Sequence, residues 1–464
     1  MEDLRRWWAL PVVGAAQLLV VLDGTIVNIA LPTAQRALGM TDANRQWAIT
    51  AYALAFGGLL LIGGRVGRAL GHRRAFALGL AGFAAASALG GLAWNPPVLF
   101  AARALQGGFA AVLAPAGLSL LMIAFTEPKE RGRALGVFAA VGAAGAAVGL
   151  IAGGLLTEYA SWRWCLYVNV PVALMALAGT AFLPRDRARG GSLDLPGALL
   201  AAAAFAALVC GFTEAEGRGW GSPVVLGLLG LGVALVAAFV AVERRTADPV
   251  LPIRVLRDRA RGGAFAAIAL MFLAVFGFYL FMSYYLQAVL GYPPVEAGLV
   301  LVVNAAAAVV GSTLIAGRLH GRVAPVALIV PGLLVAAAGM LVLTRVTPES
   351  TDVLALHVLP ALVLTGLGLG CVLPPTAALA TTGGDLGAAS AAYHASQQLG
   401  AALGTALLNT VAAAASGVGA PPAALVRGYT TALSVAAGIL LAGALLVGLL
   451  LSRTDTVATK GKTS

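Results

Sequence analysis

One stretch of the chain decides how the rest is interpreted: residues 20–32 read VVLDGTIVNIALP. Asp23 is the one charged residue in an apolar run that is long enough to cross a membrane core of about 30 Å as a helix. An embedded carboxylate costs about 2.5–3.5 kcal/mol on insertion scales, and more when it lacks a partner. Asp23 is therefore expected to pair with another side chain or to face a wet cavity.

The composition of the whole chain predicts a membrane protein. Of its 464 residues, 60% are hydrophobic and only 11% are charged, which is too apolar for a surface that faces water. The first segment, from Trp7 to Leu31, is too long for a secretory signal core and lacks a small-residue cleavage site, so we expect a retained span. The predicted fold class is all-α and integral to the membrane.

Polar residues, glycines or prolines separate fourteen apolar segments, and each segment is a predicted membrane span. They lie at about residues 9–31, 46–63, 75–93, 98–124, 134–157, 164–183, 196–214, 223–242, 263–289, 296–316, 325–344, 354–379, 390–415 and 430–451. With a cytoplasmic N-terminus, 23 of the 30 Lys and Arg residues fall on the cytoplasmic side, six fall outside and Arg103 lies within a span. This asymmetry predicts that both termini are cytoplasmic.

A basic loop indicates an internal duplication. Residues 65–74, RVGRALGHRR, follow the second span, and residues 317–322, GRLHGR, follow the tenth. We therefore predict two six-helix halves, as in transporters built from parallel repeats. The predicted parts are an N-terminal bundle in residues 1–185, two additional helices with a cytoplasmic linker in residues 186–260, a C-terminal bundle in residues 261–452 and a tail in residues 453–464.

Several other classes of function lack support in the sequence. The net charge of +11 is scattered over short loops, which argues against nucleic-acid binding. The four histidines are far apart and form no metal-ligand pattern, and we read the three cysteines as small packing residues inside spans. We expect neither an enzyme, which would need a cluster of catalytic groups, nor a receptor, which would usually carry a sensing domain.

Six sets of residues resemble one known family. Residues 22–32, LDGTIVNIALP, resemble the first-helix signature of the fourteen-span drug:proton antiporters of the major facilitator superfamily. Residues 103–107, RALQG, resemble its motif B, whose arginine is associated with proton transfer, and the fifth span keeps the glycine spacing of motif C. Further matches are residues 162–164 with 169–171, residues 287–292 with 297–299, and residues 398–400.

The resemblance implies a specific fold and activity. The fold would be two six-helix bundles plus two inserted helices. The activity would be export of hydrophobic or amphipathic drugs or antibiotics in exchange for protons, with the proton motive force in place of any cofactor and no metal. We expect a monomer in the lipid bilayer of the bacterial inner membrane. A proton symporter for another metabolite is the alternative, although it would need a cavity richer in polar groups than this sequence offers.

The conformational motifs are kept with two departures. The motif A loop usually carries an aspartate where this chain has Arg68, and motif C usually has Gly-Pro where this chain has Gly149 followed by Leu150. In the family, the motif A acid helps to hold the cytoplasmic side closed in the outward-open state. The basic Arg68 at this position is not expected to make that contact. The motif residues that remain are Gly64, Gly71, Arg73, Gly145, Gly149, Gly153 and Gly154.

Asp23 and Arg103 are the predicted proton-coupling residues. At a rise of 1.5 Å per residue, Asp23 lies about 12 Å and Arg103 about 8 Å below the outer surface, so the two side chains lie at comparable depths in the membrane. Burial disfavours the carboxylate and a nearby guanidinium favours it, so opening the cavity to one side would change its proton affinity. The alternative is a permanent salt bridge that merely holds the first span to the fourth.

Aromatic and polar residues within the spans are the candidates for lining a drug cavity. The candidates are Asn28, Gln106, Phe276, Tyr279, Tyr284, Gln287, Asn304, His394 and Gln398. For the aromatic residues the alternative is a lipid-facing or interfacial position, and for the polar residues it is hydrogen bonding between helices. Arginine outnumbers lysine 27 to 3, as in proteins of GC-rich genomes, and this is compatible with an exporter of an antibiotic that the host makes.

Overall fold

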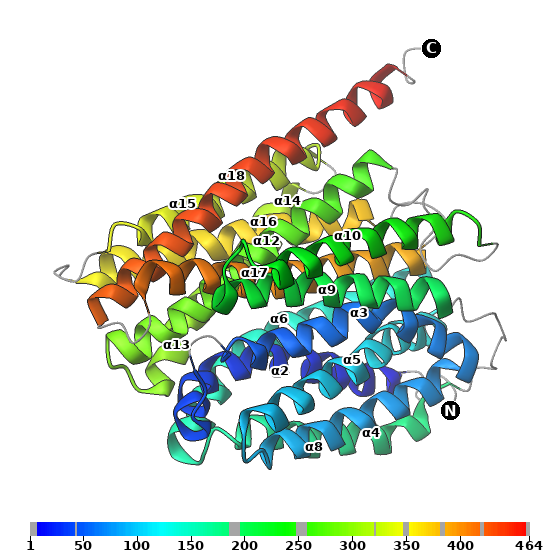
Figure 1. The fold of residues 1–464 in the computed structure, drawn as a ribbon. Coiled ribbons are helices and arrows are strands. Elements are labelled where there is room, and N and C mark those ends of the chain that lie inside the picture. Colours follow the sequence, from blue (N-terminus) through cyan, green and yellow to red (C-terminus); the bar gives the residue numbers. More distant parts are fainter. Residues whose placement is uncertain are drawn as a thin grey trace. The chain divides into compact units, whose positions relative to one another are not determined.

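The computed structural model describes residues 7–41, 44–184, 195–246, 258–319, 322–346, 352–380, 386–417 and 422–460, and in these ranges every regular element is a helix (Figure 1). The helices of the first part of the chain are α2 (Ala9–Leu38), α3 (Trp47–Leu70), α4 (His72–Gly91), α5 (Pro96–Ala124), α6 (Pro128–Tyr159), α7 (Trp164–Tyr167), α8 (Asn169–Gly179), η1 (Thr180–Phe182), α9 (Leu195–Arg218) and α10 (Pro223–Glu243). Those of the second part are α12 (Arg259–Tyr284), η2 (Tyr285–Val289), α13 (Pro294–Val310), η3 (Gly311–Ala316), α14 (Gly317–Leu319), α15 (Val326–Leu343), η4 (Leu354–Val358), α16 (Leu359–Ala380), α17 (Leu386–Ser416) and α18 (Pro422–Lys460).

The prediction of an all-helical membrane protein is confirmed. Among the described residues, twelve helices are long and apolar enough to cross a membrane, and α3 makes thirteen if its two parts, bent by 54°, are counted as one span. Helix α6 falls short because only Ala144–Tyr159 is apolar in the ranges described. The count of fourteen spans remains a prediction, although each of the fourteen predicted segments coincides with helical structure.

The chain divides into two compact units. The first contains residues 1–202 and 292–299, and the second contains residues 203–291 and 300–464. Helices α9 and α13 each pass from one unit to the other. The predicted division into residues 1–185, 186–260 and 261–452 remains a prediction, and parts of its linker, residues 185–194 and 247–257, lie outside the described ranges.

Small residues bring the helices of the first unit into backbone contact. A Cβ atom on Gly107 of α5 would collide with the carbonyl oxygen of Tyr52 on α3, and one on Gly63 of α3 would collide with the carbonyl oxygen of Ala111 on α5. Helices in lipid usually associate through such close packing, because lipid tails are as apolar as the helix surfaces and the hydrophobic effect does not drive the helices together. Helices α3 and α5 are therefore packed closely together beside the site described below.

Local sequence sets the ends of these helices. Gly71 has a φ of 87°, a conformation that side chains with a Cβ rarely adopt, and it makes the sharp turn from α3 into α4. Helix α5 begins at the N-cap Asn95, whose Oδ1 accepts a hydrogen bond from the N–H of Val98 at 3.0 Å, with prolines in the first turn. These ends fix the heights at which α4 and α5 present their polar side chains.

The second unit is built around α12. This helix packs against α17 and α18, and α15 packs against α16 and α18. Glycines again allow backbone contact, because a Cβ atom on Gly404 of α17 would meet Leu273 of α12, and one on Gly366 of α16 would meet Asn304 of α13. Helices α12, α13 and α16 thereby come together at the polar side chains of the second unit.

Candidate functional site

Six polar side chains from five helices of the first unit meet around Asp23. All are buried, with Asp23 0% and Arg103 1% exposed to solvent. Helix α2 supplies the aspartate, and α3, α4, α5 and α8 supply the residues around it. We call this group the Asp23 cluster, and its members are Asp23, Tyr52, Ser87, Arg103, Gln106 and Asn169.

Three donors hold the carboxylate of Asp23. The Nη1 of Arg103 donates to Oδ2 at 2.5 Å, the Nε2 of Gln106 donates to Oδ1 at 2.9 Å, and the Nδ2 of Asn169 donates to Oδ1 at 2.8 Å. Hydrogen bonds to a charged group are shorter and stronger than neutral ones. All three partners therefore present donors to the carboxylate oxygens.

The guanidinium of Arg103 is held from three further directions. Its Nε donates to the carbonyl oxygen of Ala48 at 2.8 Å, and Nη1 also donates to Oε1 of Gln106 at 2.9 Å. The guanidinium carbon lies 4.5 Å from the centre of the Tyr52 ring, within the range of a cation–π interaction. Arg103 therefore keeps several partners besides Asp23.

The outer members complete the network. Gln106 donates from Nε2 to the hydroxyl of Ser87 at 2.8 Å, and the hydroxyl of Tyr52 donates to the carbonyl oxygen of Val20 at 3.4 Å. A buried ion pair is stable only when further hydrogen bonds satisfy its remaining lone pairs and protons, because both charges leave water. The network supplies these bonds.

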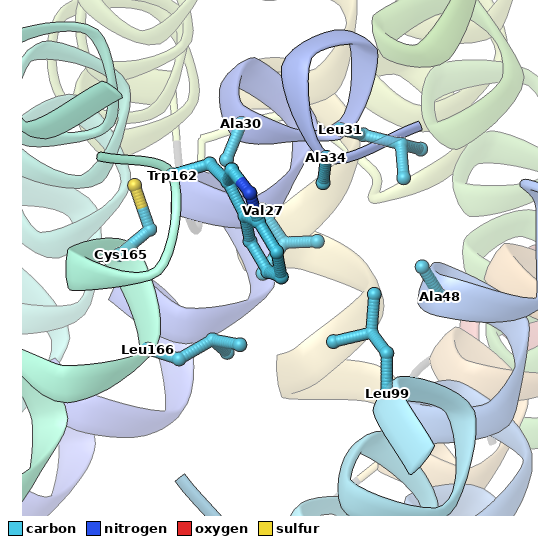
Figure 2. A pocket seen from close by; sticks show the side chains of 9 residues that line it. All are labelled: Val27, Ala30, Leu31, Ala34, Ala48, Leu99, Trp162, Cys165 and Leu166. Atoms are coloured by element: carbon cyan, nitrogen blue, oxygen red, sulfur yellow. The ribbon is translucent and has the colours of Figure 1, made fainter. Parts of the chain in front are cut away.

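An apolar pocket adjoins the Asp23 cluster in the first unit (Figure 2). Val27 lies one turn after Asp23 on α2, Leu99 lies one turn before Arg103 on α5, and Ala48 carries the carbonyl that Arg103 contacts. The free volume of the pocket is about 10 Å³, roughly the space of a single water molecule, so it is too small for a drug in the arrangement described. Its lining residues are Val27, Ala30, Leu31, Ala34, Ala48, Leu99, Trp162, Cys165 and Leu166.

The motif C glycines face other helices of the first unit. A Cβ atom on Gly149 of α6 would lie 3.0 Å from the carbonyl oxygen of Leu22 and would collide with Thr25, and one on Gly153 would lie 3.0 Å from the carbonyl oxygen of Ile26. Gly145 faces Leu18 in the same way, so these three glycines form a seam with α2. Gly154 instead faces the start of α13, where a Cβ atom would lie 2.7 Å from the carbonyl oxygen of Pro294.

A second polar cluster lies in the second unit and contains two of the predicted cavity residues. The hydroxyl of Tyr279 on α12 donates to Oδ1 of Asn304 on α13 at 2.6 Å. The Nδ2 of Asn304 donates to the carbonyl oxygen of Leu362 at 2.9 Å and to the hydroxyl of Thr365 on α16 at 2.7 Å. We call Tyr279, Asn304 and Thr365 the Asn304 cluster, and it carries no formal charge.

Six predicted cavity residues lie outside these two clusters. Phe276 stacks on Phe272 with ring centres 5.6 Å apart, and Tyr284 is buried. The Nε2 of Gln287 donates to the hydroxyl of Ser283 at 3.1 Å. The remaining three are Asn28, which donates to the carbonyl oxygen of Gly24 at 3.0 Å, the exposed His394, whose Nδ1 lies 2.9 Å from Oε1 of Gln397, and the half-buried Gln398.

The motif A residues lie at the junction of α3 and α4. Gly64 has open space where a Cβ would stand, and Gly71 makes the turn. Arg73 is half-buried in the first turn of α4, and Arg68, which replaces the family's usual aspartate, is exposed in the last turn of α3. The basic charge of Arg68 therefore faces outward from its helix.

Sequence reasoning brought Asp23 and Arg103 together but missed three members of the cluster. Tyr52 and Ser87 gave no signal beyond being polar residues in apolar spans. Asn169 belongs to a stretch that matches the family, residues 169–171, but the match assigned it no role. Its distance in sequence from Asp23, 146 residues, could be bridged only by the fold.

The fold and the site define a class of protein: a polytopic helical membrane transporter with a charge pair buried inside one of its bundles. The comparisons agree, because the profile described as Major Facilitator Superfamily matches residues 13–405. The chain belongs to the major facilitator superfamily.

Two relatives and one solved structure illustrate this membership. The chain is 54% identical to the puromycin resistance protein of Streptomyces alboniger, over 100% of the chain and 95% of that protein. It is 38% identical to the cephamycin export protein of Amycolatopsis lactamdurans, over 95% and 92% of the two chains. The crystal structure of a bacterial homologue of the human lysosomal transporter Spinster shares the fold, with a TM-score of 0.66, 16% identity and coverage of 97% and 98%.

Proposed function

We propose that this protein exports hydrophobic or amphipathic antibiotics from the bacterial cytoplasm in exchange for protons, by alternating access. The observation that carries the proposal is the buried carboxylate of Asp23, held by Arg103 together with two amide donors. A titratable group embedded in a membrane helix is costly, and such groups typically serve ion or proton pathways. In this proposal Asp23 binds the proton, and Arg103 tunes its affinity.

The hydrogen bonds suggest how the exchange proceeds. In the arrangement described, three donors favour the anion, so proton uptake requires that at least one of them moves away. Arg103 can leave Asp23 and keep its bonds to Ala48 and its contact with Tyr52. Protonation of Asp23 would thus weaken the hold of α5 on α2 while the Arg103 cation keeps its neutral partners, and loss of the proton would draw the helices together again.

The substrate class is proposed from the relatives and from the aromatic residues. The relatives that cover nearly all of the chain are named for puromycin resistance and cephamycin export. Helix α12 of the second unit carries Phe276 one turn before Tyr279 of the neutral Asn304 cluster, and such a combination of groups suits partly apolar compounds with few charges. Puromycin is therefore the first substrate to test.

We further propose that the chain acts as a monomer in the bacterial inner membrane, with both termini in the cytoplasm. The excess of Lys and Arg on one side supports this orientation. In this orientation the C-terminal end of α2 and the N-terminal end of α5 lie on the outer side, so the apolar pocket of Figure 2 lies between Asp23 and the outer surface.

The test measures puromycin and ethidium transport into inverted vesicles that are energised with a proton gradient. We expect Asp23→Asn to reduce proton-driven transport to the level of vesicles without the protein, because the amide cannot carry a proton. Exchange of labelled for unlabelled drug, which needs no net proton movement, should persist in the variant and so report that it is folded.

The matched control is Asp258→Asn. Asp258 is an exposed N-cap whose Oδ1 accepts from the N–H of Ala260 at 2.9 Å, and asparagine serves equally well at this position. This variant should transport at the wild-type rate. Proton-driven transport by Asp23→Asn at the wild-type rate would refute the proposal.

A further inference from the structure

Asn169 uses only half of its side-chain amide. Its Nδ2 donates to Oδ1 of Asp23 at 2.8 Å, whereas its own Oδ1 accepts no hydrogen bond from the residues that the structure describes. The residue is completely buried, at the first position of α8. A buried acceptor without a donor is unfavourable and uncommon, so this oxygen requires an explanation.

The protonated form of Asp23 creates a need that the described arrangement does not meet. Once Oδ1 of Asp23 carries a proton, it becomes a donor and needs an acceptor. Arg103 offers only donors, and Oε1 of Gln106 already accepts from Arg103. Of the three side chains that bond Asp23 in the described residues, only Asn169 has an acceptor that is not already in use.

The other titratable groups around Asp23 have partners of their own. On α3 the hydroxyl of Tyr52 donates to the carbonyl oxygen of Val20, and on α7 the Sγ of Cys165 pairs with the hydroxyl of Thr157 at 3.4 Å. Helix α4 contributes the neutral Ser87, and α6 faces α2 with its glycine seam. Arg103 on α5 carries the compensating charge.

We propose that Asn169 is a two-state amide that binds both protonation states of Asp23. With its NH2 group toward Asp23 it stabilises the carboxylate, and after a half-turn about χ2 its Oδ1 accepts the O–H of the acid. The two ends of an amide are nearly equal in size, so the turn needs no extra room. The proton comes from a hydronium ion, whose O–H bond breaks as the O–H bond at Asp23 forms, and a water molecule is left.

Asn169 is in this sense a positioning residue, and the inference rests on the proposed proton exchange. Without it, the acid would lie buried with an unpaired O–H, and the carboxylate would lose one of its three donors. Asn169 lets the first unit close around Asp23 in either state. The protein can then change its direction of access with the proton on board as well as without it.

The experiment measures drug-induced proton release from the purified protein as a function of pH, together with infrared difference spectra between low and high pH. In Asn169→Leu we expect the midpoint of proton release to move upward by about one pH unit, because a bond to a charged group is lost along with a weaker neutral one. The infrared C=O band of protonated Asp23 should move to the higher frequency of an acid that donates no hydrogen bond.

Two further variants keep the test decisive. Asn169→Ser retains a hydroxyl that can both donate and accept, so its midpoint and its acid band should lie close to those of the wild type. Thr157→Val removes a neighbouring buried hydrogen bond outside the Asp23 cluster and should change neither readout. If Asn169→Leu does not fold, Asn169→Ser is compared with the wild type after ¹³C labelling of asparagine, and one asparagine C=O band that shifts with pH should be missing from the variant.

The outcomes separate this inference from the proposed function. Absence of drug-induced proton release from the wild type would overturn the proton exchange itself. Normal release from the wild type combined with an unchanged midpoint and an unchanged acid band in Asn169→Leu would overturn only the role of Asn169. In the labelled comparison, a pH-insensitive set of asparagine bands in the wild type would do the same.

Discussion

The two polar clusters of the molecule differ in one respect that separates their chemistry. The Asp23 cluster of the first unit is buried, as are Asn304 and Thr365 of the Asn304 cluster in the second, and both clusters join several helices through side-chain amides. The first contains an ion pair and a titratable carboxyl group, whereas the second contains only neutral groups. Of these two clusters, only that of the first unit carries a buried ion pair.

The difference predicts how each cluster responds to change. A neutral network loses only hydrogen bonds when one member is removed, each worth about 0.5–1.5 kcal/mol. A buried ion pair loses far more, because removing one partner leaves the other charge uncompensated in a medium of low dielectric constant. The Asp23 cluster should therefore be both the less tolerant of substitution and the more sensitive to pH.

The largest effect is expected for Arg103→Leu. This change leaves the carboxylate of Asp23 buried without its cation, and we expect it to destabilise the protein by about 3–5 kcal/mol and to abolish transport. Thermal unfolding of the purified protein in detergent measures the loss of stability.

The double variant Arg103→Leu with Asp23→Asn is the control, because it removes both charges. It should recover most of the stability while remaining unable to use a proton gradient. A single variant as stable as the wild type would mean that the buried charge pair does not have the energetic weight assigned to it.

A smaller effect is expected for Asn304→Leu in the second unit. It removes the bonds to Tyr279, Leu362 and Thr365, and we expect a destabilisation of about 1–3 kcal/mol. The pH dependence of drug-induced proton release should match that of the wild type, because no charge is involved. A pH profile of proton release shifted from that of the wild type would contradict the inference that only the Asp23 cluster takes part in proton exchange.

The smallest effect is expected for Tyr279→Phe. It removes one hydroxyl whose bond to Asn304 measures 2.6 Å, so the stability should fall by about 1 kcal/mol. Drug binding measured by tryptophan quenching or by calorimetry should weaken by no more than about tenfold. A larger loss for drugs that carry hydrogen-bonding groups than for purely apolar ones would show that the hydroxyl also contacts the substrate.

The pairing of Asp23 with Arg103 could be predicted from the sequence, and the reason is energetic. Charges are rare in apolar spans, so two at similar depths are expected to find each other. The helical segments could be predicted for a similar reason, because in lipid each span must satisfy its own backbone hydrogen bonds. Both predictions depend on a large free-energy cost that a single sequence reveals.

The rest of the Asp23 cluster could not be predicted, because its members carry no such cost on their own. Ser87 and Asn169 are small polar residues that membrane helices accept in many positions, and only the packing of α4 and α8 brings them to Asp23. Gln106 is predicted to line a drug cavity, which stays a prediction, and the structure shows in addition that it donates to the carboxylate of Asp23. The role of a polar side chain in a span depends on which helices meet around it.

The glycine seam between α2 and α6 has a mechanical consequence. Because Gly149 and Gly153 place backbone directly against backbone, no layer of flexible side chains lies between the two helices to absorb displacement. A shift of α2, the helix that carries Asp23, should therefore move α6 with it. A fluorescent label at the exposed Tyr159, at the far end of α6, would report the movement of the buried acid from a distance.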